Sequence, residues 1–129
     1  MMTCTFNRLL TGVSFAEADA RTRKAPGETG FGVLTVTDVA ATMKKKLDFE
    51  MTPYLILGAC NPGMAYQAIG IEPRVGAMLP SNVILRAVDG GVEVSVINPV
   101  ASMQAIDNPA IYAVAGQVRD LLVKAIAAI

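Results

Sequence analysis

The sequence predicts an α+β fold in which a single, mainly antiparallel, curved sheet has helices packed on one face. The clearest sign is Asp89-Gly90, which separates two apolar runs and is typical of a tight hairpin. In the second run Val92, Val94 and Val96 alternate with polar residues, so one face of that strand is buried and the other meets water. The remaining apolar runs are short and are separated by helix-start signals, which favours helices mixed with strands over an all-β or all-α chain.

Length and composition indicate one domain over residues 1–129. The chain is 53% hydrophobic and 17% charged, with a mean hydropathy of +0.46. Intrinsic disorder is excluded because it requires low hydrophobicity and high net charge. A disulfide-stapled fold is excluded because the chain has only two cysteines.

The first third of the chain predicts a strand, then a helix. The strand covers residues 3–10. Ser14 and Glu17 have the spacing of a capping box, which starts a helix that runs to about Lys24. Pro26 then ends that helix, because proline cannot continue the hydrogen-bond ladder.

Two apolar runs in the middle of the chain predict strands, with a short helix between them. Phe31–Thr37 is rich in β-branched residues, and Asp38 can cap a helix over Ala40–Leu47. Tyr54–Cys60 is continuously apolar and short, as expected for a buried central strand.

Two Asn-Pro pairs predict the remaining helix starts. Asparagine is a favoured N-cap, and proline is tolerated at the first helical position. Asn61-Pro62 therefore begins a helix that ends at Gly70, and Asn108-Pro109 begins the last helix. We expect a short strand over Val75–Leu79 between them.

Several function classes are excluded by charge and composition. Eleven basic and eleven acidic residues give zero net charge, so no global field attracts nucleic acid or an anionic membrane. The longest uncharged stretch, Met51–Ile71, is interrupted by prolines and glycines, so we predict no membrane span. Since no signal peptide is recognisable either, we expect a cytoplasmic protein with reduced cysteines. We predict no metal site and no cofactor, and the sequence has no histidine.

The low charge also predicts self-association. A compact monomer of this mass exposes about 6,500 Å², so 22 charged side chains leave the surface unusually apolar. Such a surface with zero net charge favours a homodimer, the commonest oligomer. We expect either the strand Val83–Val88 or the C-terminal helix to face the second subunit.

Three ordered blocks resemble the bacterial and archaeal family known as domain of unknown function 302. The blocks are Gly30–Thr35, Pro53–Pro62 and Leu79–Val83, and Gly-Ala-Cys-Asn-Pro is the most specific segment. The resemblance runs from about Ser14 to the C-terminus. It implies a small α+β fold with a curved sheet, a homodimer and no established activity.

The chain departs from the family pattern at three positions. Many members have cysteine where Ser81 stands and aspartate where Asn98 stands, and relatives usually have an apolar residue at the position of Pro26. The missing second cysteine puts a two-cysteine redox or metal role in doubt, and Pro26 is expected to end or kink the first helix.

The candidate ligand-binding residues are Cys60, Asn61, Lys44 and Lys46. Cys60 precedes the helix start at Asn61, where free backbone N–H groups can stabilise a thiolate or bind an anion. The Lys44–Lys46 run could complete an anion site if the fold brings it near. The simpler interpretation is that Cys60 is a small buried hydrophobe and that the lysines form a solvated helix face. The methionines are interpreted as packing residues, because they show no metal-ligand spacing.

Three functions therefore remain open, and no catalytic residue can be nominated. The first is a homodimeric module that binds a small ligand, with an anion as one option. The second is a thiol-dependent redox or metal-responsive protein centred on Cys60. The third is a purely structural partner protein, which would have no polar pocket.

Overall fold

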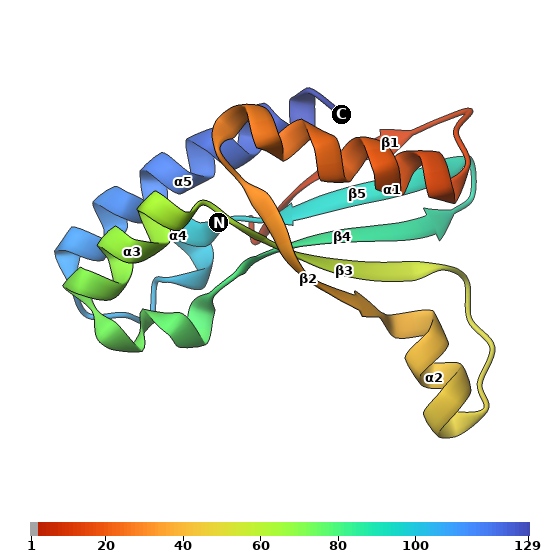
Figure 1. Cartoon of the computed structure of the whole chain (residues 1–129), viewed down its shortest axis with the longest axis horizontal. Coiled ribbons are helices and arrows are strands. Elements are labelled where there is room, and N and C mark those ends of the chain that lie inside the picture. Colours follow the sequence, from red (N-terminus) through yellow and green to blue (C-terminus); the bar gives the residue numbers. More distant parts are fainter. Residues whose placement is uncertain (1–2) are drawn as a thin grey trace.

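The computed structural model describes residues 3–129 and contains one sheet of five strands (Figure 1). The strands are β1 (Thr5–Leu10), β2 (Gly32–Asp38), β3 (Tyr54–Cys60), β4 (Ser81–Val88) and β5 (Gly91–Ile97). The α-helices are α1 (Phe15–Lys24), α2 (Val39–Leu47), α3 (Pro62–Ile71), α4 (Pro99–Ser102) and α5 (Pro109–Ala127). Two 3-10 helices complete the fold, η1 (Ala25–Thr29) and η2 (Pro73–Met78).

All strand pairs in the sheet are antiparallel, in the order β1-β5-β4-β3-β2. The β4–β5 hairpin turns at Asp89 and Gly90, as predicted, and Gly90 has the positive φ of 88° that such a turn requires. The α+β architecture is therefore confirmed. The strand β3 is interior but not central, because β4 occupies the middle of the sheet.

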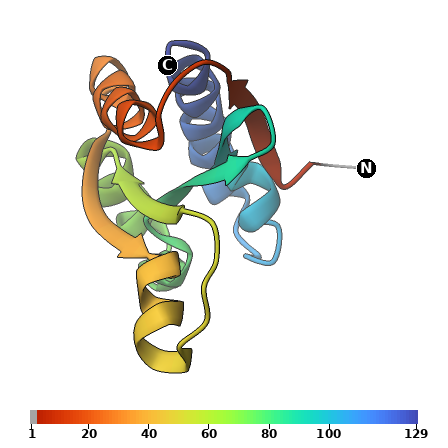
Figure 2. The same ribbon diagram turned by 90° about the vertical axis from the view of Figure 1, so that its right-hand side faces the viewer.

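Helices α1 and α5 cover the same face of the sheet. Helix α1 contacts β4 and β5, and α5 contacts β1 and β5. Figure 2 shows both helices on one side of the strands. The side chains that point toward them include Leu57, Leu85 and Val94, all with 0% exposure. This alternation confirms the buried face predicted for the second hairpin strand.

A second, smaller core lies at one end of the sheet, between α3, η2, α4 and α5. It is formed by apolar residues from segments that are far apart in the sequence. Its buried members are Ala68, Val75, Met103, Ile111, Val114 and Ala115.

Side chains cap the helices where the sequence predicted them. Ser14 accepts a hydrogen bond of 3.1 Å from the backbone N–H of Glu17, and Asp38 accepts one of 2.9 Å from Ala41. Asn61 and Asn108 cap α3 and α5 in the same way. These contacts satisfy backbone N–H groups that have no partner within a helix.

The structure corrects the prediction at two places. The segment Val75–Leu79 is not a strand, because it belongs largely to η2, which starts at Pro73 and is capped by the side chain of Glu72. The helix α4 was not predicted, although Asn98-Pro99 carries the same start signal as α3 and α5; its four residues show no periodic pattern after that signal. The predicted end of the first helix is confirmed, because α1 ends at Lys24 and Pro26 lies in the tighter turn η1 that follows.

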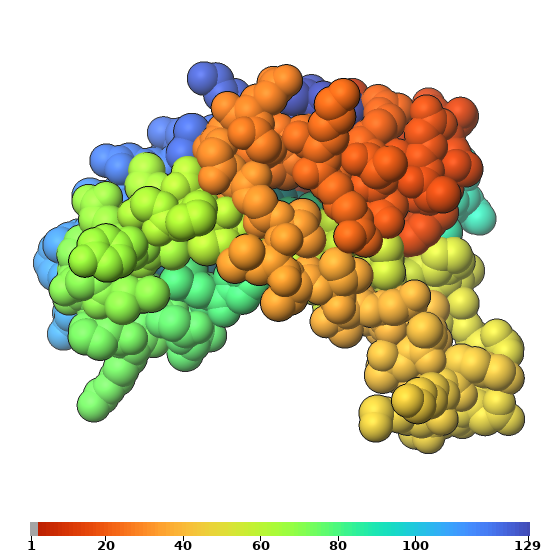
Figure 3. Space-filling model, in the orientation of Figure 1, coloured from red at the N-terminus to blue at the C-terminus, as the bar shows by residue number. Residues whose placement is uncertain are grey.

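The segment from Val39 to Pro53 projects from the rest of the molecule, and we call it the arm. It consists of α2 and the extended residues that lead to β3. Helix α2 has no buried residue. Figures 1 and 3 show the arm standing away from the body of the protein. In Figure 2 it lies at the end of the molecule opposite α1 and α5.

No helix within residues 3–129 combines the length and the apolar character needed to cross a membrane.

Candidate functional site

A small cavity of about 30 Å³ lies where β3 ends, between the sheet and helices α3 and α5. Its walls come from five separate parts of the chain, and apolar side chains dominate them. The residues relevant to its chemistry are Phe31, Cys60, Met64, Ser81, Met103 and Val114. No charged side chain lines this cavity.

Cys60 reaches the cavity from the last position of β3. It pairs with Gly32 on β2, and its side chain is half-buried. The thiol is free, as is that of the exposed Cys4. The structure therefore places Cys60 at a cavity wall, neither sealed in the core nor fully exposed.

Asn61 shapes the cavity, but its side chain is already engaged. Its Oδ1 accepts a hydrogen bond of 3.2 Å from the backbone N–H of Met64, which caps α3. Its Nδ2 donates a hydrogen bond of 3.3 Å to the backbone carbonyl of Thr29. Because both ends of the amide have protein partners, Asn61 holds the cavity walls in place, and only its second N–H and second lone pair remain unassigned.

Ser81 is the site residue that the sequence argument missed. It is the first residue of β4, lies opposite Ala59 in the sheet, and is 7% exposed. Within residues 3–129 no fully buried side-chain polar atom lacks a hydrogen-bond partner, so the hydroxyl of Ser81 is not a sealed, unsatisfied group. The sequence singled out Ser81 only as a position where many similar proteins have cysteine, since a single serine at a strand start carries no pattern of its own.

Gly58 allows the chain to close tightly beside the cavity. A side chain at this position would lie 2.6 Å from Cγ of Pro80 and would also collide with the hydroxyl of Thr35. Pro80 and Thr35 can therefore pack directly over the β3 backbone. The glycine in the Gly-Ala-Cys-Asn-Pro segment thus has a packing role.

The structure does not bring Lys44 and Lys46 to Cys60. Both lie on α2, which contacts β3, whereas β3 runs from the arm at Tyr54 to the cavity at Cys60. Seven strand residues span about 20 Å. The anion site that combined these lysines with the helix start is therefore not assembled within one chain.

The lysine at position 44 has local acidic partners. Its Nζ lies 2.7 Å from Asp48 and 2.8 Å from Glu50, on the same exposed arm. Hydrogen bonds to Asp48 and then to Glu50 raise the pKa of Lys44 above its ordinary value of 10.5. Lys44 is therefore fully charged at neutral pH.

The chemistry of the cavity follows from these placements. It offers an apolar wall, one thiol and one buried hydroxyl. The backbone N–H of Met64, at the start of α3, already donates a hydrogen bond to the side chain of Asn61. This N–H is therefore not free to bind an anion, which weakens an anion site at the start of the helix. Within residues 3–129 no three His, Cys, Asp or Glu side chains are grouped as metal ligands.

Comparison with known proteins places this fold in a family. A model of the domain of unknown function DUF302 matches residues 7–129. The chain belongs to the DUF302 family. The match includes most of β1, so it begins earlier than the resemblance noted from about Ser14.

A solved DUF302 structure has the same fold. It is the crystal structure of an uncharacterized conserved DUF302 protein from Bacillus stearothermophilus, which superposes with a TM-score of 0.88. The two sequences are 22% identical, and the similarity covers 96% of each chain. No curated protein matches this DUF302 chain.

Proposed function

We propose that this DUF302 protein is a homodimeric module that binds a small, neutral, mainly apolar ligand in the cavity beside Cys60. The observation that carries the proposal is that Ser81, which is 7% exposed, and Cys60 line the same mainly apolar cavity. A serine hydroxyl can both donate and accept a hydrogen bond, so Ser81 can orient one oxygen of a ligand within this apolar cavity.

The walls of the cavity determine the class of ligand. No charged side chain lines it, so an anion would lose its hydration without gaining a partner. A neutral compound that presents an apolar body to Val114 and one oxygen to Ser81 fits better. This proposal retains Cys60 from the predicted ligand-binding set and gives Asn61 a structural role. It assigns no role in binding to Lys44 or Lys46.

The size of the cavity restricts the ligand further. A space of about 30 Å³ accommodates little more than a water molecule. Met64 and Met103 both lie in its walls, and methionine side chains are flexible enough to move aside. A ligand with several carbon atoms therefore binds by displacing these side chains.

The proposal includes a cytoplasmic location, which the two free thiols support, because thiols remain reduced in that compartment.

Binding can be tested with four probes followed by amide NMR: 2-propanol, cyclohexanol, cyclohexane and benzoate. We expect cyclohexanol to shift the amide signals of Cys60, Met64 and Ser81 at lower concentration than the other three. Ser81→Ala should weaken cyclohexanol binding several-fold and leave cyclohexane unaffected. Ser102→Ala is the matched control, because that hydroxyl already donates to the carbonyl of Pro99 and lies outside this cavity.

Protection of the thiol gives a second measurement. In a Cys4→Ser background, cyclohexanol should slow the alkylation of Cys60 by iodoacetamide. Absence of any probe-induced shift at the cavity, or preferential binding of benzoate there, would refute the proposal.

A further inference from the structure

The arm and the adjoining edge strand expose apolar side chains that monomeric proteins usually bury. Phe49 is 64% exposed and Leu34 is 66% exposed. Further large apolar side chains are exposed beside them, namely Val36, Leu47 and Met51. Leu47, Phe49 and Met51 lie within five residues on the arm, and a gathering of exposed apolar side chains marks a protein interaction surface.

Helix α2 lacks the packing that a short helix requires. It has nine residues, and isolated helices of fewer than about 12 residues are marginal in water. Helices in proteins are stabilised mainly by burying an apolar face, but α2 buries none of its residues. Contact with another molecule would supply the burial that α2 lacks.

The total surface area supports a partner of standard size. The chain exposes 7383 Å². A compact monomer of this mass exposes about 6,500 Å², so roughly 900 Å² is in excess. A stable protein interface buries about 800 Å² on each partner, so one interface accounts for the excess.

The arm is also complementary in charge to a second copy of itself. Beside it, a groove of about 430 Å³ runs between α1 and the start of α2 and contains Asp19, which pairs with Arg23 at 2.7 Å, and Asp38, which caps α2 and has no basic side-chain partner within residues 3–129. The opposite end of α2 carries Lys45 and Lys46, which form no ion pair within residues 3–129. Two α2 helices placed antiparallel would bring the basic end of each to the acidic groove of the other. Such an arrangement has the two-fold symmetry of most homodimers.

The edge strand contributes side chains to this surface. The pairing of β2 with β3 shifts between Val33 and Thr35, which leaves Leu34 as the bulged residue. A bulge interrupts the regular hydrogen-bonding edge and disfavours the addition of another strand. The partner is therefore expected to pack against the exposed side chains and not to extend the sheet.

We propose that the arm is the dimer interface, where α2 and Phe49 of one copy pack antiparallel against the arm and acidic groove of a second copy. This inference rests on the homodimer in the proposed function and specifies its contact surface. It replaces the strand Val83–Val88 and the C-terminal helix as the candidate interface.

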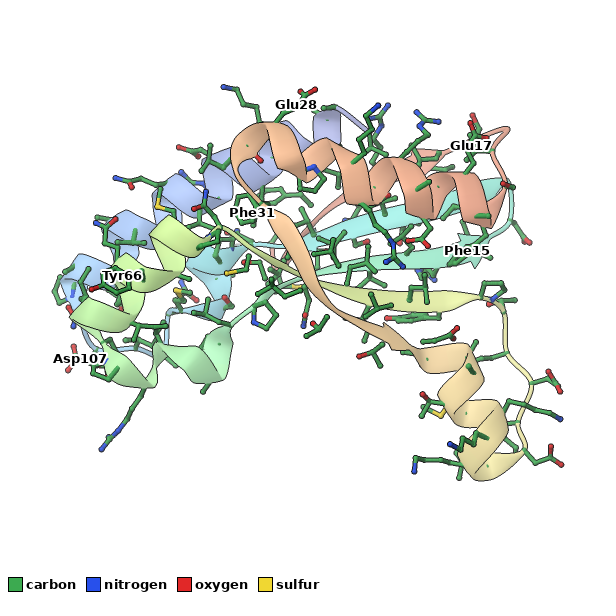
Figure 4. The ribbon with its side chains drawn as sticks, viewed as in Figure 1. Phe15, Glu17, Glu28, Phe31, Tyr66 and Asp107 are labelled. Carbon is green, nitrogen blue, oxygen red and sulfur yellow. The ribbon has the colours of Figure 1, made fainter. Side chains whose placement is uncertain are left out.

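The test measures the mass of the full chain by size-exclusion chromatography with light scattering at micromolar concentration. The wild type should have twice the chain mass of 13.5 kDa. Phe49→Asp should shift the population to monomer. Tyr66→Asp is the matched control, because Tyr66 is an aromatic residue with 84% exposure on α3, at the end of the molecule opposite the arm (Figure 4).

Disulfide trapping tests the antiparallel arrangement independently. In a Cys4→Ser, Cys60→Ser background, Met43→Cys, at the middle of α2 where two antiparallel copies cross, should form an intermolecular disulfide under mild oxidation, whereas Tyr66→Cys should not. A monomeric wild type would refute both this inference and the homodimer. A dimer that persists in Phe49→Asp would refute the arm interface alone, and neither result affects the cavity test with cyclohexanol.

Discussion

Asn61 connects two segments that are distant in the sequence by donating a hydrogen bond of 3.3 Å from its Nδ2 to the backbone carbonyl of Thr29. The same side chain caps α3 through its Oδ1. One residue therefore starts a helix and also fixes the turn that leads into β2. Both contacts are adjacent to Cys60, so the cavity wall depends on them.

Replacement of Asn61 by alanine should destabilise the protein. Loss of an N-cap costs about 1 kcal/mol, and loss of the hydrogen bond to Thr29 costs about 1 kcal/mol more. Urea unfolding monitored by circular dichroism measures the change. Asn61→Asp keeps the cap oxygen but not the amide donor, so it should lose about half as much. Equal stability of the alanine variant and the wild type would contradict this assignment.

Gly30 is expected to resist substitution, whereas Gly27 in the same turn is not. Gly30 has a φ of +81°, and an added Cβ would lie 2.9 Å from Nδ2 of Asn61. Gly30→Ala should therefore cost at least about 1 kcal/mol from backbone strain alone. Gly27 has open space around it, so Gly27→Ala should leave the melting temperature nearly unchanged. Equal losses of melting temperature in the two variants would contradict the role assigned here to the positive φ of Gly30.

Arg8 joins β1 to the end of α5. Its Nη1 donates to the backbone carbonyls of Ile126 and Ala127, at 3.1 Å and 2.9 Å. A cation at this place also interacts favourably with the helix dipole. Arg8→Met should therefore reduce the free energy of unfolding by about 2 kcal/mol. Urea titration measures the loss, and Arg8→Lys should restore part of it because the charge is retained.

Two neighbouring residues on β4 should differ in their sensitivity to truncation. Leu85 faces the helices and is fully buried, while Ile84 points to the opposite face and is only partly buried. Leu85→Ala should cost roughly 2–5 kcal/mol, because it leaves a cavity in the core. Ile84→Ala should cost less. Urea titrations of both variants measure the two losses in the free energy of unfolding. A larger loss for Ile84→Ala than for Leu85→Ala would show that the two faces of β4 are assigned wrongly.

Local signals in the sequence were sufficient for most element boundaries. Asn61-Pro62 started a helix and Asp89-Gly90 turned a hairpin, because capping and turn geometry depend on residues that are adjacent in the chain. The segment Val75–Leu79 was predicted wrongly, since five mainly apolar residues have too little periodicity to distinguish a strand from a 3-10 turn.

The candidate site could be predicted only in part. Cys60 and Asn61 were identified because they lie at a strand-to-helix junction, which is visible in the sequence. Ser81 was missed because its importance comes from its burial beside Ala59, a neighbour only in the folded sheet. The side chain of Asn61 likewise proved to be engaged by Thr29, which lies 32 residues away.

The sequence by itself determined the fold class, the hairpin, the helix caps and an apolar composition that favours association. These properties arise from hydrogen bonds and hydrophobic periodicity within a few neighbouring residues. Only the tertiary structure decided where the functional groups meet. It placed Ser81 with Cys60 in an apolar cavity, and it separated both from Lys44 by the length of β3. The reason is that strand pairing and helix packing join segments whose separation along the chain gives no measure of their distance in space.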